Sequence, residues 1–216
     1  MANLKLKTAP AEYPVSVSEA KDYLRVDGSL EDSRILTMIK AATTRLEKYV
    51  DQKFISQVWY QYMDNFQMKT SSDWWDGVRE MATSEMYSPQ PWLELMIGPM
   101  RVLNVFKTYA DDGVGVTFNS SNYVLDTTGP YGRVALKLGG VWPTTILRKV
   151  NGIEIEFEVG IAANAASCPD DIKQAVLSYV ATLYENRGDE KVVAPVTAMA
   201  LLEPYKRFKV GMQLGR

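Results

Sequence analysis

Residues 169–188, PDDIKQAVLSYVATLYENRG, carry the signals of a complete α-helix, with a start and an end. Pro169 suits the first turn, where a missing N–H costs nothing, and the two aspartates that follow place negative charge at the positive end of the helix dipole. Gly188 is typical of the residue that ends a helix. Apolar residues recur at steps of three and four, which predicts one buried face made of Ile172, Ala175, Val176, Tyr179, Val180 and Leu183. The other face is a mixed polar surface without a cluster that suggests chemistry, so the stretch predicts a packing helix.

Two helices are predicted near the N-terminus. Ser16 and Glu19 have the spacing of a capping box, which favours a short helix beginning next to them. A longer helix is predicted over residues 31–50, because apolar residues follow the helical period there: Ile35, Ile39, Ala42, Leu46, Tyr49 and Val50. We expect these two helices to pack as a hairpin.

The middle of the chain follows the period of a β-strand. FISQVWYQYM, which begins at Phe54, alternates side chains as a strand does. Turn signals separate the segments that follow, such as Asp111-Asp112-Gly113. Further strands are predicted at residues 92–97, 102–110, 114–118, 122–126, 133–137 and 152–160. This run of short strands predicts a compact antiparallel sheet or a small barrel.

The order of helices, strands and helices predicts an α+β fold. We expect a helical bundle built from the N- and C-terminal helices, with an inserted antiparallel β-domain. The predicted boundaries are a helical hairpin at 1–53, the β-domain at 54–161 with a long loop at 68–91, C-terminal helices at 162–204 and a basic arm at 205–216.

The loop at residues 68–91 follows neither the helical nor the strand period. It contains Trp74 and Trp75, and an exposed pair of indole rings would be costly to hydrate. The two tryptophans therefore either fold back onto the sheet or contact a partner.

Composition excludes several classes of function. The 216 residues carry a net charge of −2 and are 46% hydrophobic, so the chain can bury a core and has no bulk attraction to nucleic acid or to a membrane. With Cys168 as the single cysteine and no histidine, an intrachain disulfide, the usual zinc sites and His-dependent triads are excluded. There is neither an apolar run of membrane-spanning length nor a signal-peptide pattern, so we expect a soluble protein made in the cytoplasm.

Glu154, Glu156 and Glu158 alternate with apolar residues, so they share one face of a strand. Three carboxylates could hold Mg²⁺ in a metal-dependent nuclease. Successive same-face residues lie about 6.6–7 Å apart along a strand, however, which is too far for neighbours to chelate one ion tightly. A solvent face or the wall of an acidic channel is the favoured interpretation. The glycines form no phosphate-binding loop, and the sequence indicates no enzyme, no metal site and no cofactor.

Several segments, in their order, resemble the head-to-tail connector proteins of tailed phages, which are also called adaptor or head-completion proteins. At the N-terminal end these are PVSVSEAKDYLRVD (14–27), the helix at 31–50 and FISQVW (54–59). Later in the chain they are NYVLDTTGPYGRVAL (122–136), IEFEVGI (155–161), the helix at 169–187 and LLEPYKRF (201–208). The segment at 68–91 departs from the family by its length.

The resemblance implies a structural virion protein at the neck of the particle, at the portal vertex, which is present in the host cytoplasm before assembly. In this family about a dozen copies form a homo-oligomeric ring beneath the portal, which continues the DNA channel and offers a platform to the next neck or tail protein. The acidic strand face at Glu154, Glu156 and Glu158 could then line the channel, since a surface without cations lets double-stranded DNA pass without sequence-specific binding.

The basic arm at 205–216 is expected to contact the portal. Tyr205, Arg207 and Phe208 are expected to anchor the subunit on the portal, while Lys206 and Lys209 meet acidic groups there. The alternative is a frayed terminus. Two other functions stay open: a head-closure or tail-tube protein of the same virion and, more distantly, the metal-dependent nuclease.

Overall fold

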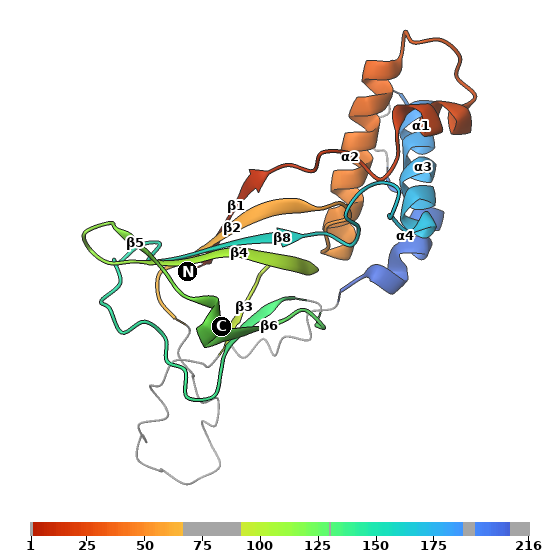
Figure 1. The fold of residues 1–216 in the computed structure, drawn as a ribbon. Helices are drawn as coiled ribbons and strands as arrows, with labels where there is room; N and C mark the ends of the chain where they lie inside the picture. The colour runs from red at the N-terminus through yellow and green to blue at the C-terminus, as the bar shows by residue number, and fades with distance from the viewer. Residues whose placement is uncertain (1, 67–91, 130, 188–192, 208–216) are drawn as a thin grey trace, which may run out of the picture. The chain divides into compact units, whose positions relative to one another are not determined.

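The computed structural model describes residues 2–66, 92–129, 131–187 and 193–207, and the chain divides into two compact units. One unit contains residues 1–7, 58–96 and 100–158, and we call it the β-unit. The other contains residues 8–57, 97–99 and 159–216, and we call it the helical unit. Together the described elements make a mixed α+β fold with four α-helices and two antiparallel sheets (Figure 1).

The strands form a five-stranded sheet in the order β1-β2-β8-β4-β5 and a three-stranded sheet in the order β3-β7-β6. The registers are antiparallel where β4 meets β5, with Thr108 opposite Val116, and where β7 meets β3 and β6. The strands are β1 (Ala2–Thr8), β2 (Gln57–Met63), β3 (Trp92–Glu94), β4 (Met100–Tyr109), β5 (Gly115–Thr117), β6 (Tyr123–Asp126), β7 (Arg133–Leu136) and β8 (Ile153–Val159).

Two features of the sheets differ from the sequence prediction. The predicted strands divide between two sheets instead of forming one. The buried side chain of Gln61 in β2 links the two sheets, since its amide donates to Glu94 O at 3.1 Å and accepts from Met96 N–H at 2.9 Å. Residues 1–53 were also predicted to be one helical hairpin, whereas Ala2–Thr8 is the edge strand β1. Its short alternation, ANLKLKT, gains stability only from pairing with a sheet.

Aromatic rings fill the core of the β-unit. Phe66 stacks on Trp142 with ring centroids 4.8 Å apart, and Phe106 meets Phe118 edge-on at 5.3 Å. Tyr123 stacks against Phe118 at 5.8 Å. Such offset and edge-on pairs add to the free energy of area burial, so this cluster fixes the packing of the strands that carry it.

The helical unit contains α1 (Val17–Leu24), α2 (Asp32–Val50), α3 (Asp170–Glu185) and α4 (Val196–Leu202). A short 3-10 turn follows α4 at Glu203–Tyr205, and another lies in the β-unit at Ser120–Asn122. The capping box of α1 is confirmed, since Ser16 and Glu19 bond reciprocally. Helix α3 begins after Pro169 as predicted and ends at Glu185, while Gly188 lies outside the described residues.

One hydrophobic core joins the helices from both ends of the chain. Its fully buried members include Ile39 and Leu46 of α2, Ile172 and Val176 of α3, and Leu202 of α4. The helices α2 and α3 pack side by side, and α4 packs against α3 (Figure 1). No helix within the described ranges is long and apolar enough to cross a membrane.

Candidate functional site

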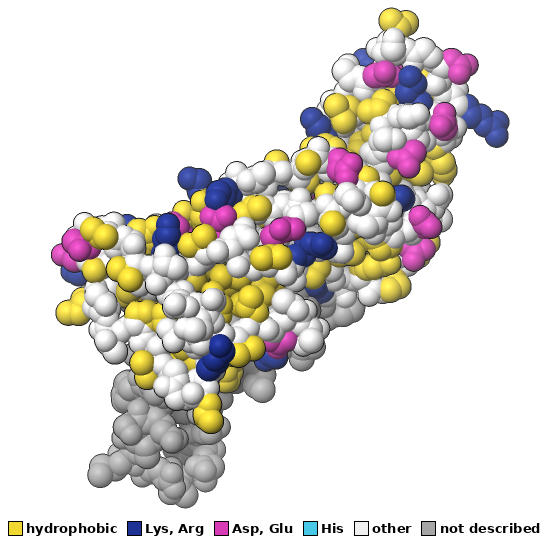
Figure 2. Space-filling view, in the orientation of Figure 1, with side chains coloured by type: hydrophobic (Ala, Val, Ile, Leu, Met, Phe, Trp, Pro, Cys, Tyr) yellow, Lys and Arg dark blue, Asp and Glu magenta, His cyan; other side chains and the backbone are white. Residues whose placement is uncertain are grey.

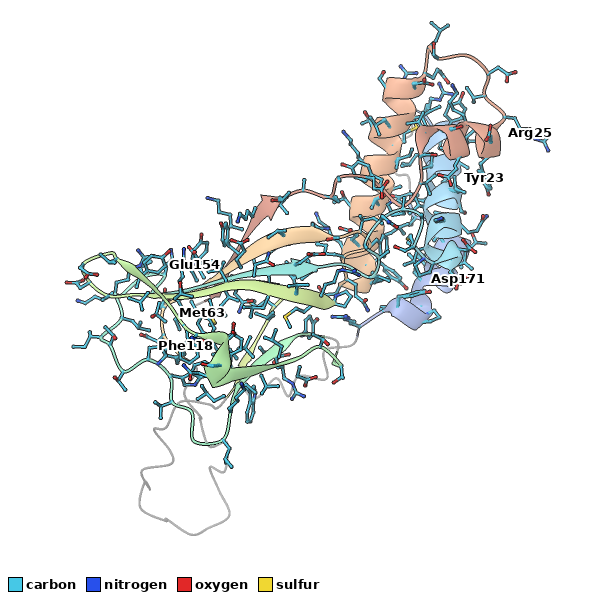
Figure 3. All side chains as sticks on the ribbon, in the orientation of Figure 1. Tyr23, Arg25, Met63, Phe118, Glu154 and Asp171 are labelled. Carbon is cyan, nitrogen blue, oxygen red and sulfur yellow. The ribbon has the colours of Figure 1, made fainter. Side chains whose placement is uncertain are left out.

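The three glutamates of β8 lie on one face of the five-stranded sheet, at its centre. Burial alternates along β8, so that Ile155 and Phe157 are buried while Glu154, Glu156 and Glu158 are partly exposed. Figure 3 shows Glu154 on the opposite side of the sheet from Met63 and Phe118. The prediction that the three carboxylates share a face is therefore confirmed, and we call them the β8 glutamate row.

Glu156, in the middle of the row, is paired from both sides. Lys7 Nζ of β1 lies 2.6 Å from Glu156 Oε2, and Asn104 Nδ2 of β4 donates to Oε1 at 3.3 Å. Burial raises the pKa of Glu156, but the bonds from Lys7 and Asn104 outweigh it and leave the pKa below its ordinary value. The same bond raises the pKa of Lys7, whose ammonium also lies 5.2 Å from the centre of the Tyr60 ring. Both groups are thus held in their charged forms.

The other two glutamates have partners of different kinds. Arg101 Nε of β4 donates to Glu158 Oε1 at 3.3 Å. Glu154 interacts with the hydroxyls of Tyr62 and Tyr109, one on each neighbouring strand. Burial, together with the charge of Glu154, raises the pKa of Tyr62 to about 12 and also raises the pKa of Tyr109. The two hydroxyls therefore remain protonated donors toward this carboxylate.

These contacts decide what the row can do chemically. Lys7 and Arg101 pair with two of the carboxylates, and tyrosine hydroxyls engage the third, so every carboxylate of the row is occupied by a neighbouring side chain. Within the described parts of the chain, no group of three or more Asp, Glu, Cys or His residues is arranged to hold a metal ion. The row is a mildly acidic, hydrogen-bonded surface.

The described start of the basic arm lies against the C-terminal end of α2. Arg207 N–H donates to Val50 O at 3.1 Å, and the amide of Gln52 donates to Tyr205 O. Lys206 Nζ lies 4.5 Å from the centre of the Tyr49 ring and 3.8 Å from Glu203 Oε1. Burial raises the pKa of Tyr205. Residues 205–207 therefore bind their own helical unit, and Phe208 and Lys209 lie outside the described residues.

The remaining predicted contact, Trp74 and Trp75, also lies outside the described residues. Sequence reasoning found the glutamate row but missed every partner around it: Lys7, Tyr60, Tyr62, Arg101, Asn104 and Tyr109. The period of two could have assigned faces within β2 and β4. It could not have found which strands flank β8, because β1, β2 and β4 are distant from β8 in sequence.

No protein-family model and no curated protein matches the chain. Chains in several solved structures do match. A chain in the neck of an empty gene transfer agent (GTA) particle, computed with C6 symmetry, is 22% identical, with a TM-score of 0.74 over 97% of this chain and 98% of that chain. The protein therefore has the same fold as this GTA neck chain.

Two further similar chains have comparable scores. One comes from the neck of a native GTA particle computed with C12 symmetry, with a TM-score of 0.72, 22% identity and coverage of 97% and 98%. Another comes from the virion of a native GTA particle, with a TM-score of 0.71, 23% identity and coverage of 97% of each chain. The likeness therefore spans both units rather than one shared motif.

Proposed function

We propose that this chain is a structural protein of a virion neck, in which identical copies form a ring-shaped adaptor between the portal and the next neck or tail protein. The observation that carries the proposal is the fold similarity to GTA neck chains over 97% of the sequence. Those neck structures have C6 and C12 symmetry, which supports a closed ring of copies. The chain is made in the host cytoplasm, joins the portal vertex and has no catalytic role.

In this proposal the β8 glutamate row lines the DNA channel. A channel wall must let DNA slide, and each protein cation that pairs with a phosphate adds affinity through counterion release. Two cations that flank the row, Lys7 and Arg101, are each bonded to one of its glutamates. Their charges are thereby neutralised locally, which supports a wall that passes double-stranded DNA without holding it.

A charge reversal in the row tests the channel assignment. Glu154→Lys introduces a cation that no carboxylate of the row neutralises, and Glu154→Gln is the matched control. We expect rings of the lysine variant to retain double-stranded DNA at low salt and release it at high salt, whereas wild-type and glutamine rings retain none. Equal retention by all three would remove the row from the channel.

The basic arm supplies the contact with the portal. Tyr205, Lys206 and Arg207 hold the start of the arm on α2. Phe208 and Lys209 are assigned to the portal contact. Aromatic and cationic anchors carry much of the free energy of protein interfaces. Trp74 and Trp75 are assigned to a second partner contact.

Electron microscopy of the protein mixed with the portal of the same virus tests the function as a whole. We expect a ring of copies on one end of the portal. Deleting residues 208–216 leaves the contacts of Tyr205 and Arg207 intact, so we expect the melting temperature of the truncated protein to be unchanged. We expect the truncated protein not to bind the portal. Normal decoration by the truncated protein would move the docking surface elsewhere. A wild-type protein that never binds portals but caps tail tubes would instead identify a head-closure or tail-tube protein.

A head-closure or tail-tube protein is expected to be dominated by β-structure, whereas α1–α4 build the core of a whole unit here. The nuclease alternative needs carboxylates available to a metal, and those of the β8 glutamate row are engaged by other side chains. No observation favours either function over the adaptor.

A further inference from the structure

One face of α2 is exposed along its length. The helix buries Ile35, Ile39 and Leu46 on one side, and on the other side an open depression of about 490 Å³ follows the helix surface. Its lining combines small residues with cations: Thr37, Lys40, Ala41, Thr44, Arg45 and Lys48. We call these residues the α2 cationic face.

The cations of this face are not neutralised within the described residues. Lys40 Nζ lies 5.8 Å from the centre of the Tyr13 ring, and neither Arg45 nor Lys48 makes an ion pair with another described residue. The small side chains Thr37, Ala41 and Thr44 occupy the middle of the face, which lets another chain approach the helix backbone closely. The face thus has the shape and the charge to receive an acidic helical surface.

The same unit carries exposed acidic residues at both ends of α3, while α4 packs beside the middle of that helix, where Ser178 Oγ lies 3.3 Å from Thr197 Oγ1. Asp170, Asp171, Gln174 and Glu185 are all exposed, and none of the three carboxylates forms an ion pair with another described residue. We call these residues the α3 acidic face. Figure 2 shows acidic side chains spread over α1 and α3 in this view, and Figure 3 shows Asp171 projecting from α3 away from the core.

The two faces point in opposite directions. Helices α2 and α3 pack against each other through their buried residues, such as Leu46 and Val176. The exposed face of each helix is therefore turned away from the other helix. Two complementary surfaces on opposite sides of one unit are what a head-to-tail contact between identical copies requires.

We propose that the α2 cationic face of one copy binds the α3 acidic face of the next copy, and that this contact closes the ring. The inference rests on the proposed ring. It commits to a second copy of this chain because the complementary charge is present on the chain itself. The C6 and C12 symmetry of the structurally similar necks supports repeated head-to-tail contacts of this kind.

Paired charge reversals test the contact. The first variant carries Arg45→Glu and Lys48→Glu, which makes both faces acidic, and the second carries Asp171→Lys and Glu185→Lys, which makes both faces basic. Each variant alone should form no rings, because identical faces repel. An equimolar mixture should form rings of alternating copies, which close when the number of copies is even, as in C6 and C12 arrangements. Lys137→Glu with Lys149→Glu, two exposed residues of the β-unit, is the matched control and should form rings as the wild type does.

The measurement is mass photometry and electron microscopy of each preparation, alone and with the portal of the same virus, at low and at high salt. Recovery of rings in the mixture alone establishes the contact, since misfolded variants cannot rescue each other. Normal rings from either single variant, or no rings from the mixture, would overturn it. Normal rings that have lost affinity for DNA would overturn it too and assign the α2 cationic face to nucleic acid. Absence of wild-type rings with and without portal would defeat the proposed function itself, which separates the two failures.

Discussion

The backbone N–H of Phe54 donates a hydrogen bond to Glu47 Oε1 at 3.0 Å, and both residues are buried. The second oxygen of the same carboxylate lies 2.8 Å from Lys53 Nζ. One side chain near the end of α2 therefore fixes the segment that leaves the helix toward β2. A buried N–H without an acceptor would cost free energy comparable to a lost hydrogen bond.

We therefore expect Glu47→Ala to lower the free energy of unfolding by about 1–3 kcal/mol, because it leaves the N–H of Phe54 unsatisfied. Glu47→Gln keeps an acceptor for that N–H and should cost less. Urea unfolding of the two variants measures the difference. Equal losses for alanine and glutamine would assign the effect to the charge rather than to the hydrogen bond.

The shared core of the helical unit gives a second prediction. Leu46 of α2 is fully buried, whereas Leu183 of α3 is only partly buried. Leu46→Ala should destabilise the protein by about 2–5 kcal/mol, through lost burial and the cavity that remains. Leu183→Ala should cost less, since water reaches part of the side chain. Thermal unfolding of both variants gives the comparison, and a neutral Leu46→Ala would contradict the common core.

A third prediction concerns acid stability. Asp126, at the end of β6, accepts bonds from the Thr128 hydroxyl and N–H and from Arg133, and these bonds hold the pKa of Asp126 at about 2. Because this pKa lies below the ordinary value of 3.8, the ionised carboxylate stabilises the folded state above that pH, and the stabilisation is lost as the pH falls toward 2.

Asp126→Asn should therefore be less stable than the wild type at neutral pH, and the difference should shrink as the pH falls toward 2. Melting temperatures recorded across this range test the prediction. Asp112→Asn is the control, since Asp112 makes a single local bond, to Val114 N–H. A difference between Asp126→Asn and the wild type that stays constant with pH would contradict the ionisation mechanism.

The alkaline range gives a fourth prediction. The pKa of Tyr62 is raised to about 12 from an ordinary value of 10.0, because burial and the charge of Glu154 disfavour the phenolate. The unfolded chain loses this proton first, so the contribution of Tyr62 to stability is present below pH 10 and declines as the pH rises toward 12.

Ultraviolet titration of tyrosinate should show a late-ionising group that disappears in Tyr62→Phe. Glu154→Gln should shift the same group to lower pH, because it removes the nearby negative charge. A late group that persists in Tyr62→Phe would have to belong to another tyrosine.

Much of the local structure follows from the sequence. The capping box of Ser16 and Glu19, the extent of α2 and the start of α3 after Pro169 depend on neighbouring residues and on the helical period, and the structure has them as predicted. The same reasoning placed the three glutamates of β8 on one face, because the period of a strand fixes faces without knowledge of its neighbours.

The sequence alone did not determine the contacts made between distant segments. The pairing of Lys7 with Glu156 and of Arg101 with Glu158 depends on strand order, and so does the bond by which the buried amide of Gln61 links the two sheets. The opposite directions of the α2 cationic face and the α3 acidic face likewise appear only when the two helices pack. Hydrophobic periodicity states which side of an element is buried, but the same period fits many partners, and only the packed chain decides which one is present.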